Sequence, residues 1–225
     1  MSNKSGQTNK PVNPCKAITG KDTRLCYPHV WEPYAREGEK QKYSCCAAIP
    51  KTDTETVEKI RKSTEAAYKE GEAKLKGNGK SVPPMSAIRL PLRDGDLERP
   101  DDPAFAGMWF INAKSDHAPG IVDMSCEPIL DRDEVYPGCY CRISLSFYAY
   151  NFNGNRGIAC GLNNIQKVRD GERLGGHSSA ADDFGGLEDL SESSIRETGP
   201  MLQPSKARSG FGNGDRRMVD EDFLA

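Results

Sequence analysis

Residues 138–152 read GCYCRISLSFYAYNF, and residues 156–168 read RGIACGLNNIQKV after a short NGN link at 153–155. Both runs are rich in apolar and aromatic residues, which favour strands. The Asn153-Gly154 step favours the positive φ angles of a tight hairpin turn. This stretch therefore predicts two long antiparallel strands, Gly138 to Phe152 and Arg156 to Val168, joined by a short turn.

The side chains of the first strand alternate in character, and this period of two assigns them to two faces of a sheet. The odd-numbered face is uniformly apolar and fits a barrel interior: Cys139, Cys141, Ile143, Leu145, Phe147 and Ala149. The even-numbered face mixes aromatic rings, small hydroxyls and one arginine: Tyr140, Arg142, Ser144, Ser146, Tyr148, Tyr150 and Phe152. Such a face suits single-stranded nucleic acid, because rings stack bases and a guanidinium binds phosphate. It equally suits a covered sheet or a subunit interface, so that alternative stays open.

Further elements are predicted between residues 17 and 114. Strands are expected over Ala17–Trp31, either as one strand or as two with a turn at Lys21-Asp22, and over Lys42–Ile49 and Met108–Lys114. The capping box at 52–55 and the helical spacing of the apolar residues that follow predict one helix from about Thr54 to Leu75. Turn-forming residues and charges between 77 and 103 predict a long connection.

These elements predict a mainly β fold. Five antiparallel strands and one helix are typical of a small OB-fold-like Greek-key barrel, with a half-open sandwich as the alternative. We expect residues 14–184 to form this domain and residues 1–13 to form a disordered arm. Residues 185–225 carry five basic and eight acidic side chains, so this predicted flexible tail has a net charge of −3 and the rest of the chain +1. The tail ends in an acidic tip: Asp220, Glu221, Asp222, Phe223, Leu224 and Ala225.

Other classes of protein find little support in the sequence. The longest apolar runs are far shorter than a membrane span, and the polar start MSNKSGQTNK lacks the apolar region of a secretory signal, so we expect a cytoplasmic protein and no membrane contact. The eight cysteines lack zinc-type spacing, which predicts reduced, buried thiols. No phosphate-binding loop or nucleophile–base spacing is present, and the aspartates at 94, 96, 101 and 102 fit turn chemistry. We therefore expect no catalysis, no metal and no cofactor.

Neighbouring strands extend the predicted binding face. Alternation over 108–114 places Phe110 and Lys114 on one side, and Arg156 and Lys167 lie on the strand after the hairpin, where cations can follow a nucleic-acid backbone. The predicted DNA-binding residues are Tyr140, Arg142, Tyr148, Tyr150, Phe152, Phe110, Lys114, Arg156 and Lys167. An acidic tail tip (Asp220, Glu221, Asp222, Phe223, Leu224) can compete with nucleic acid for this surface or recruit other proteins.

The sequence also resembles a known family, the OB-fold single-stranded DNA-binding proteins of tailed bacteriophages. The resemblance covers about residues 16–184 and rests on the strings LPLRDGD (90–96), RPDDPAFAG (99–107), FINA (110–113), PGIVD (119–123), GCY (138–140), FYAYN (147–151), NGNRGIACGLNN (153–164), QKVRDGE (166–172) and LGGHSSAADDF (174–184).

This resemblance implies a protein that coats single strands during phage DNA replication, recombination or repair, inside the bacterial host cell. It also implies weak sequence preference and self-association, with a homodimer expected. The tip is similar to the acidic tip of bacterial single-stranded DNA-binding proteins but lacks their Pro-Phe end. The similarity of the tip, and not its missing Pro-Phe end, implies phage or host replication and recombination proteins as its partners.

Overall fold

A computed structural model of the chain describes residues 13–79 and 81–175. The strands are β1 (Lys16–Ile18), β2 (Arg24–Tyr34), β3 (Lys42–Pro50), β4 (Arg93–Asp94), β5 (Met108–Ser115), β6 (Gly120–Val122), β7 (Tyr140–Phe152) and β8 (Asn155–Arg169). The helices are α1 (Thr54–Glu70), α2 (Glu72–Lys76) and α3 (Gly95–Glu98), with 3-10 turns at Met85–Ala87, Pro103–Phe105 and Arg132–Glu134. The predicted arm lies almost wholly, and the predicted tail entirely, outside the described residues.

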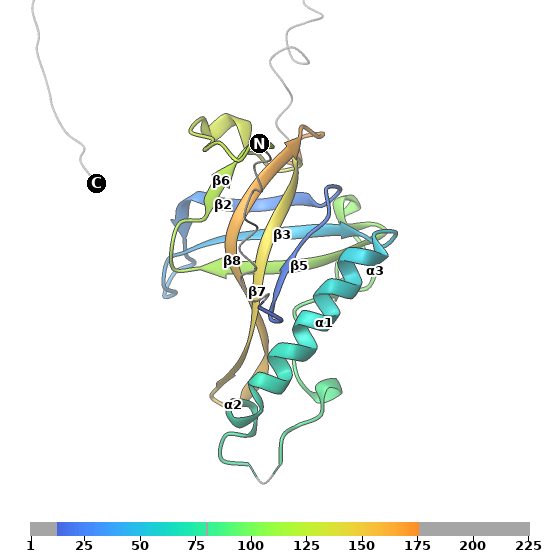
Figure 1. Cartoon of the computed structure of the whole chain (residues 1–225), viewed down its shortest axis with the longest axis vertical. Coiled ribbons are helices and arrows are strands. Elements are labelled where there is room, and N and C mark those ends of the chain that lie inside the picture. Colours follow the sequence, from blue (N-terminus) through green and yellow to red (C-terminus); the bar gives the residue numbers. More distant parts are fainter. Residues whose placement is uncertain (1–12, 80, 176–225) are drawn as a thin grey trace, which may run out of the picture. The chain divides into compact units, whose positions relative to one another are not determined.

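Five of the strands close into a barrel. β2 pairs with β3 and β3 with β5, both antiparallel, and β5 continues to β8 through a parallel bridge. β8 pairs with β7 along its length, and β7 returns to β2. This order is the Greek-key arrangement of an OB barrel, which confirms the predicted fold class. Figure 1 shows the β7–β8 ribbon running across β2, β3 and β5.

The details of the sheet differ from the prediction in two respects. The sheet has eight strands rather than five, because β1, β4 and β6 add short pairings at its margins. It is also not wholly antiparallel, since β8 pairs in parallel with both β5 and β6. Strands of two or three residues are too short to show alternation, and sequence alone does not reveal parallel pairing between distant segments.

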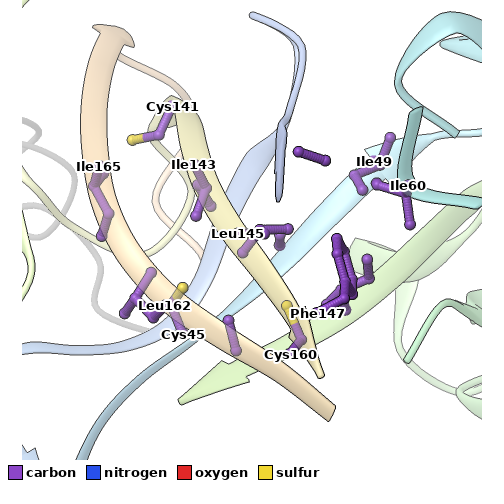
Figure 2. Packing of buried hydrophobic residues seen from close by; sticks show 14 of the residues in the cluster. Cys45, Ile49, Ile60, Cys141, Ile143, Leu145, Phe147, Cys160, Leu162 and Ile165 are labelled. Atoms are coloured by element: carbon purple, nitrogen blue, oxygen red, sulfur yellow. The ribbon is translucent and has the colours of Figure 1, made fainter. Parts of the chain in front are cut away.

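The barrel interior contains the residues that alternation assigned to it. Cys141, Ile143, Leu145 and Phe147 of β7 are all buried. Figure 2 shows these side chains beside those of β8, with β3 and α1 contributing to the same core. The further labelled members of this cluster are Cys45, Ile49, Ile60, Cys160, Leu162 and Ile165. Because the odd-numbered side chains of β7 point into the core, its even-numbered side chains point to the outside of the barrel.

Helix α1 begins where the sequence predicts and covers one side of this core. Asp53 caps it, because its carboxylate accepts a hydrogen bond from the Thr56 amide at 3.1 Å. Val57, Ile60 and Ala67 are among its buried residues, and α1 packs against β1 and β7 (Figure 1). The helix stops at Gly71, where any side chain would collide with Ala149 of β7. A short second helix, α2, then replaces the predicted last turn.

The β7–β8 turn has the predicted conformation. Asn153 and Gly154 have φ angles of 48° and 81°, and the strands resume at Asn155. Both positive angles match a two-residue hairpin loop.

All eight cysteines are free, and seven are buried as predicted. Cys126 differs, because it lies exposed in the irregular connection that follows β6. In the described part of the chain, no helix is long and apolar enough to cross a membrane.

Candidate nucleic-acid interface

A groove of about 760 Å³ lies on the outside of the barrel between β5, the β7–β8 ribbon and the segment 88–93. β3 and β5, the second and third strands of the barrel, contribute Lys42, Asn112 and Lys114. β7 contributes Tyr148 and Tyr150. The other lining residues are Ile88, Arg89, Leu90, Pro91, Leu92, Arg93, Glu98, Ile158, Ala159 and Cys160.

Two neighbouring tyrosines form the aromatic wall of the groove. Tyr148 is 49% exposed and Tyr150 is half-buried. A glycine on β8 leaves room for the Tyr150 ring, because a Cβ at Gly157 would lie 2.9 Å from its Cε1 atom. A Cβ at Gly161 would lie 3.6 Å from Cε1 of Tyr148, which is an ordinary van der Waals contact. Partial burial raises the pKa of the Tyr148 hydroxyl, so this residue is a neutral aromatic surface at physiological pH.

The other walls are positively charged. Lys42, Arg89, Arg93 and Lys114 line the groove against one carboxylate, Glu98. Glu98 pairs with Arg93, and Lys42 lies 3.7 Å from Asp116 at the side. Among the described residues, no carboxylate lies within ion-pair distance of Arg89 or Lys114. These two cations are therefore available to an anionic ligand.

A second aromatic pair continues this outer face onto β2. Tyr34 pairs with Lys42 of β3, which lines the groove, and His29 pairs with Ser44, two residues further along the same strand. Their rings stack at 4.5 Å between centroids, and Tyr34 is 55% exposed. The outer face thus runs from this pair across β3 and β5 to the two tyrosines of β7.

The structure brings some of the predicted binding residues together and separates others. Tyr148, Tyr150 and Lys114 line one groove, and Phe152, 72% exposed, follows on the same face of β7 at the hairpin. Tyr140 lies at the opposite end of β7, outside this groove.

The ring of Tyr140 is in cation–π contact with Arg169 at 3.5 Å and Arg24 at 5.7 Å. Arg142 donates a hydrogen bond to Gln166 at 3.2 Å. Tyr140 and Arg142 therefore share the outer face of β7 but engage other side chains.

Three of the predictions need correction. Phe110 is fully buried against Phe105, with ring centroids 5.4 Å apart, so it offers no free face to a base. Arg156 sits opposite Asn151, whose amide donates to the Lys74 carbonyl of α2, so it faces α2 rather than the groove. Lys167 is only 15% exposed and pairs with Asp170 at 2.9 Å.

Sequence reasoning also missed several groove residues. Arg89 and Arg93 lie in the connection that was expected only to be irregular, and Lys42 begins a predicted strand whose face was not assigned. Tyr34 and His29 of β2, which lie outside the groove lining, are not predicted either, because two irregularities in the β2–β3 register interrupt the alternation of β2. The basic residues within segment 88–93 are a signal that could have been read from the sequence.

Three of the aspartates between 94 and 102, namely Asp94, Asp96 and Asp102, have structural roles. Lys51 Nζ contacts Asp94 at 2.6 Å and Asp96 at 2.7 Å. The hydrogen bond from Lys51 to Asp96 holds the pKa of Asp96 below its usual value. Asp102 caps a 3-10 turn by accepting from the Ala104 amide. Within the described ranges, no cluster of three or more potential metal ligands occurs. The predicted tail-tip residues, Asp220, Glu221, Asp222, Phe223 and Leu224, lie outside the described residues.

Strand order and groove together define an OB-fold protein, a class that binds oligonucleotides or oligosaccharides on the face of its second and third strands. Residues 15–195 match the family of the Enterobacter phage Enc34 ssDNA-binding protein, and the chain belongs to that family. The chain is also 29% identical over 182 residues to "Putative protein p50" of Acyrthosiphon pisum secondary endosymbiont phage 1, covering 77% of this chain and 95% of that protein.

Solved structures share the same fold. The bacteriophage Enc34 single-stranded DNA-binding protein in complex with ssDNA superimposes with a TM-score of 0.58 at 24% identity, over 74% of this chain and 96% of that one. The single-stranded DNA-binding protein gp2.5 of bacteriophage T7 gives a TM-score of 0.51 at 16% identity, over 78% and 96% of the two chains. These likenesses confirm the fold that the strand order indicates.

Proposed function

We propose that this chain binds single-stranded DNA in the groove between β5 and the β7–β8 ribbon. The observation that carries the proposal is one groove that holds two adjacent tyrosine rings, Tyr148 and Tyr150, and two cations, Arg89 and Lys114. Neither cation has a carboxylate partner in the part of the chain that the structure describes. Membership of the phage ssDNA-binding family supports it, as does the ssDNA complex of the structurally similar Enc34 protein.

Binding follows from the chemistry of the two walls. Unpaired bases stack on Tyr148 and Tyr150, and each stacked base contributes on the order of 1–3 kcal/mol regardless of its identity. Phosphates contact Lys114 and Arg89, releasing counterions. A duplex hides its bases from both rings, so single strands are preferred. No step of this binding requires bond making or a cofactor, and the role we propose is non-enzymatic.

The proposed biological role is to coat single strands during phage DNA replication, recombination or repair in the cytoplasm of the host cell. Sequence-tolerant stacking suits a protein that must cover any exposed strand. We further propose self-association as a homodimer, and an acidic tail tip that competes for the groove or recruits replication and recombination proteins. The tip carries three carboxylates next to Phe223 and Leu224, which supplies both charge and an apolar anchor.

Paired substitutions at the two tyrosines test the proposal. The variant Tyr148→Ala/Tyr150→Ala removes both rings, whereas the matched control Tyr148→Phe/Tyr150→Phe keeps them. Affinity for labelled oligo(dT) and for a duplex of equal length is measured by fluorescence anisotropy, and folding by thermal melting.

We expect the alanine pair to bind single strands more than about tenfold more weakly, with its melting temperature retained, and the phenylalanine pair to bind like the natural protein. Undiminished binding by the alanine pair would refute the proposal. A fall in mass from dimer to monomer with DNA affinity unchanged would instead assign this aromatic face to a subunit contact.

A further inference from the structure

A second hollow, of about 640 Å³, opens on the outside of β2 and shares no lining residue with the groove. We term it the Tyr27 pocket. It lies between the turn at Pro103–Phe105 and the irregular segment 172–175 that follows β8. Its lining includes Arg24, Cys26, Tyr27, Phe105, Arg173 and Leu174.

Tyr27 is held in an unusual conformation at this pocket. Its φ angle is 46°, in the left-handed region that non-glycine residues seldom adopt, and its side chain is 56% exposed. It follows Cys26 directly, where the β2–β3 register shifts. Strained residues of this kind concentrate at ligand-binding positions, and an exposed aromatic ring brings no compensating burial. The left-handed backbone at Tyr27 thus holds its aromatic ring at the protein surface.

The surroundings of the ring suit a nucleotide. The Tyr27 ring lies nearly parallel to that of Phe105, at 8° and 6.3 Å between centroids, and Phe105, Cys26 and Leu174 supply apolar lining. The Tyr27 hydroxyl donates to Asp102 at 2.9 Å, which fixes the ring. A base can therefore stack on a surface whose position is already set, at little cost in side-chain freedom.

Arginines surround this aromatic surface. The guanidinium of Arg99 lies 5.4 Å from the Tyr27 centroid and 4.4 Å from that of Phe105. Arg24 and Arg173 are in the lining itself, together with the carboxylates of Asp102 and Glu172. The two arginines of the lining balance its two carboxylates, so Arg99 over the two rings supplies the net positive charge beside the pocket.

A row of cations connects the groove to the Tyr27 pocket. Arg93, which lines the groove, lies 4.9 Å from the Phe110 ring centroid. Arg99 lies 4.7 Å from the same centroid, so the two guanidinium groups are separated by less than the sum of these distances. The same Arg99 guanidinium also lies 5.4 Å from the Tyr27 ring centroid. A DNA backbone leaving the groove at Arg93 thus meets a second cation before the pocket.

We propose that the Tyr27 pocket binds a further unpaired nucleotide of the same DNA strand, with its base on Tyr27 and its phosphate on the surrounding arginines. This inference rests on the proposed function, because it extends the bound strand beyond the groove. It predicts that the pocket contributes only to oligonucleotides long enough to span both sites.

Oligonucleotide length separates the two sites experimentally. Full-length protein is titrated with oligo(dT) of about 4 to 16 nucleotides, the range of OB-domain site sizes. The variant Tyr27→Asn removes the ring, and asparagine tolerates the left-handed backbone, whereas the control Tyr27→Phe keeps the ring and loses only the hydroxyl. Arg173→Ala tests the pocket without touching the strained residue, and thermal melting checks the fold of each variant.

We expect Tyr27→Asn and Arg173→Ala to match the natural protein on the shortest oligonucleotides. On the longer ones, Tyr27→Asn weakens binding at least about fivefold, the effect of one lost base stack, whereas Tyr27→Phe does not. A groove variant such as Tyr148→Ala/Tyr150→Ala weakens binding at every length. As a direct readout, single 5-iododeoxyuridine positions in the long oligonucleotide should photocrosslink to Tyr27 itself. Tandem mass spectrometry of the tryptic peptide 25–36 locates the crosslink, because His29 and Tyr34 of the groove side lie in the same peptide.

Several results would overturn the inference. Equal binding of both pocket variants and the natural protein at all lengths, with no crosslink at Tyr27, removes the pocket from the DNA path while the groove proposal stands. Tighter binding by Tyr27→Asn would indicate that the pocket holds a competitor, such as the chain's own acidic tip. Failure of the natural protein to bind any oligonucleotide would overturn the proposed function and this inference together.

Discussion

Lys114→Ala gives a quantitative test of the charged wall of the groove. Lys114 is exposed on β5, and neither it nor Arg89 has a carboxylate partner among the described residues, whereas Lys42 and Arg93 do. Two to four cations are thus available for phosphates. Single strands give a salt slope of about −0.7 per neutralised phosphate, so log K against log[salt] should have a slope between about −1.4 and −2.8.

Removing Lys114 should reduce the magnitude of this slope by about 0.7. Over a tenfold range of salt, the natural protein then loses roughly 25- to 600-fold in affinity, and the variant loses about fivefold less. Fluorescence anisotropy with oligo(dT) at four or more salt concentrations resolves this difference. Because the side chain is exposed, we expect the unfolding midpoint to be retained.

The matched control is Lys69→Ala, an exposed lysine in the last turn of α1 that does not line the groove. It removes the same charge from the molecule and should leave the slope unchanged. If Lys114→Ala has the same salt slope as the natural protein, Lys114 does not contact a phosphate. An equal fall in slope for Lys114→Ala and Lys69→Ala would also refute a phosphate contact at Lys114, because net charge would then be responsible.

Three further outcomes are expected. Ile143 lies in the fully buried centre of β7, so Ile143→Ala should lower the free energy of unfolding by about 2–5 kcal/mol. Urea titrations followed by circular dichroism measure this loss. A loss below about 1 kcal/mol would contradict a packed interior. In the same assay, Gly138→Ala should lower the free energy of unfolding more than Gly154→Ala. Both glycines have positive φ angles, which strain any other residue. Only at Gly138 would the new Cβ also collide with backbone, at 2.0 Å from the Glu172 carbonyl oxygen. A chain ending at Phe184 should bind oligo(dT) more tightly at low salt, because the acidic tip no longer competes; unchanged or weaker binding would remove that role from the tail.

The part of the site that alternation predicts is the part built on an unbroken strand. Between Cys141 and Phe147, the odd residues face the core without exception, so Tyr148 and Tyr150 had to face outward. The hairpin followed from a local preference of Asn153-Gly154. Both inferences depend only on residues close in sequence, which is why the sequence was sufficient for them.

The errors arise where distant segments meet or the register shifts. β8 has an irregularity opposite Ser144 and Leu145, and beyond it Lys167 pairs with the inward-facing Cys141. A single extra residue therefore changes the face on which that lysine lies. Phe110 occupies the outer face of β5 as predicted, but Phe105 and Arg99 from the connection cover it. No local pattern reveals that a loop folds over a strand.

The burial of the cysteines makes the unmodified protein suitable for single-site thiol labelling. Burial raises the pKa of Cys26 to about 11 and of Cys46 to about 12, so these thiols are both inaccessible and protonated. The thiol–thiol contact with Cys141, at 3.5 Å, lowers the pKa of Cys139, yet Cys139 too is fully buried. Cys126 alone is exposed, so a maleimide dye should attach once, next to β6. A rise in labelling stoichiometry from one toward eight would then record opening of the barrel, with no engineered cysteine required.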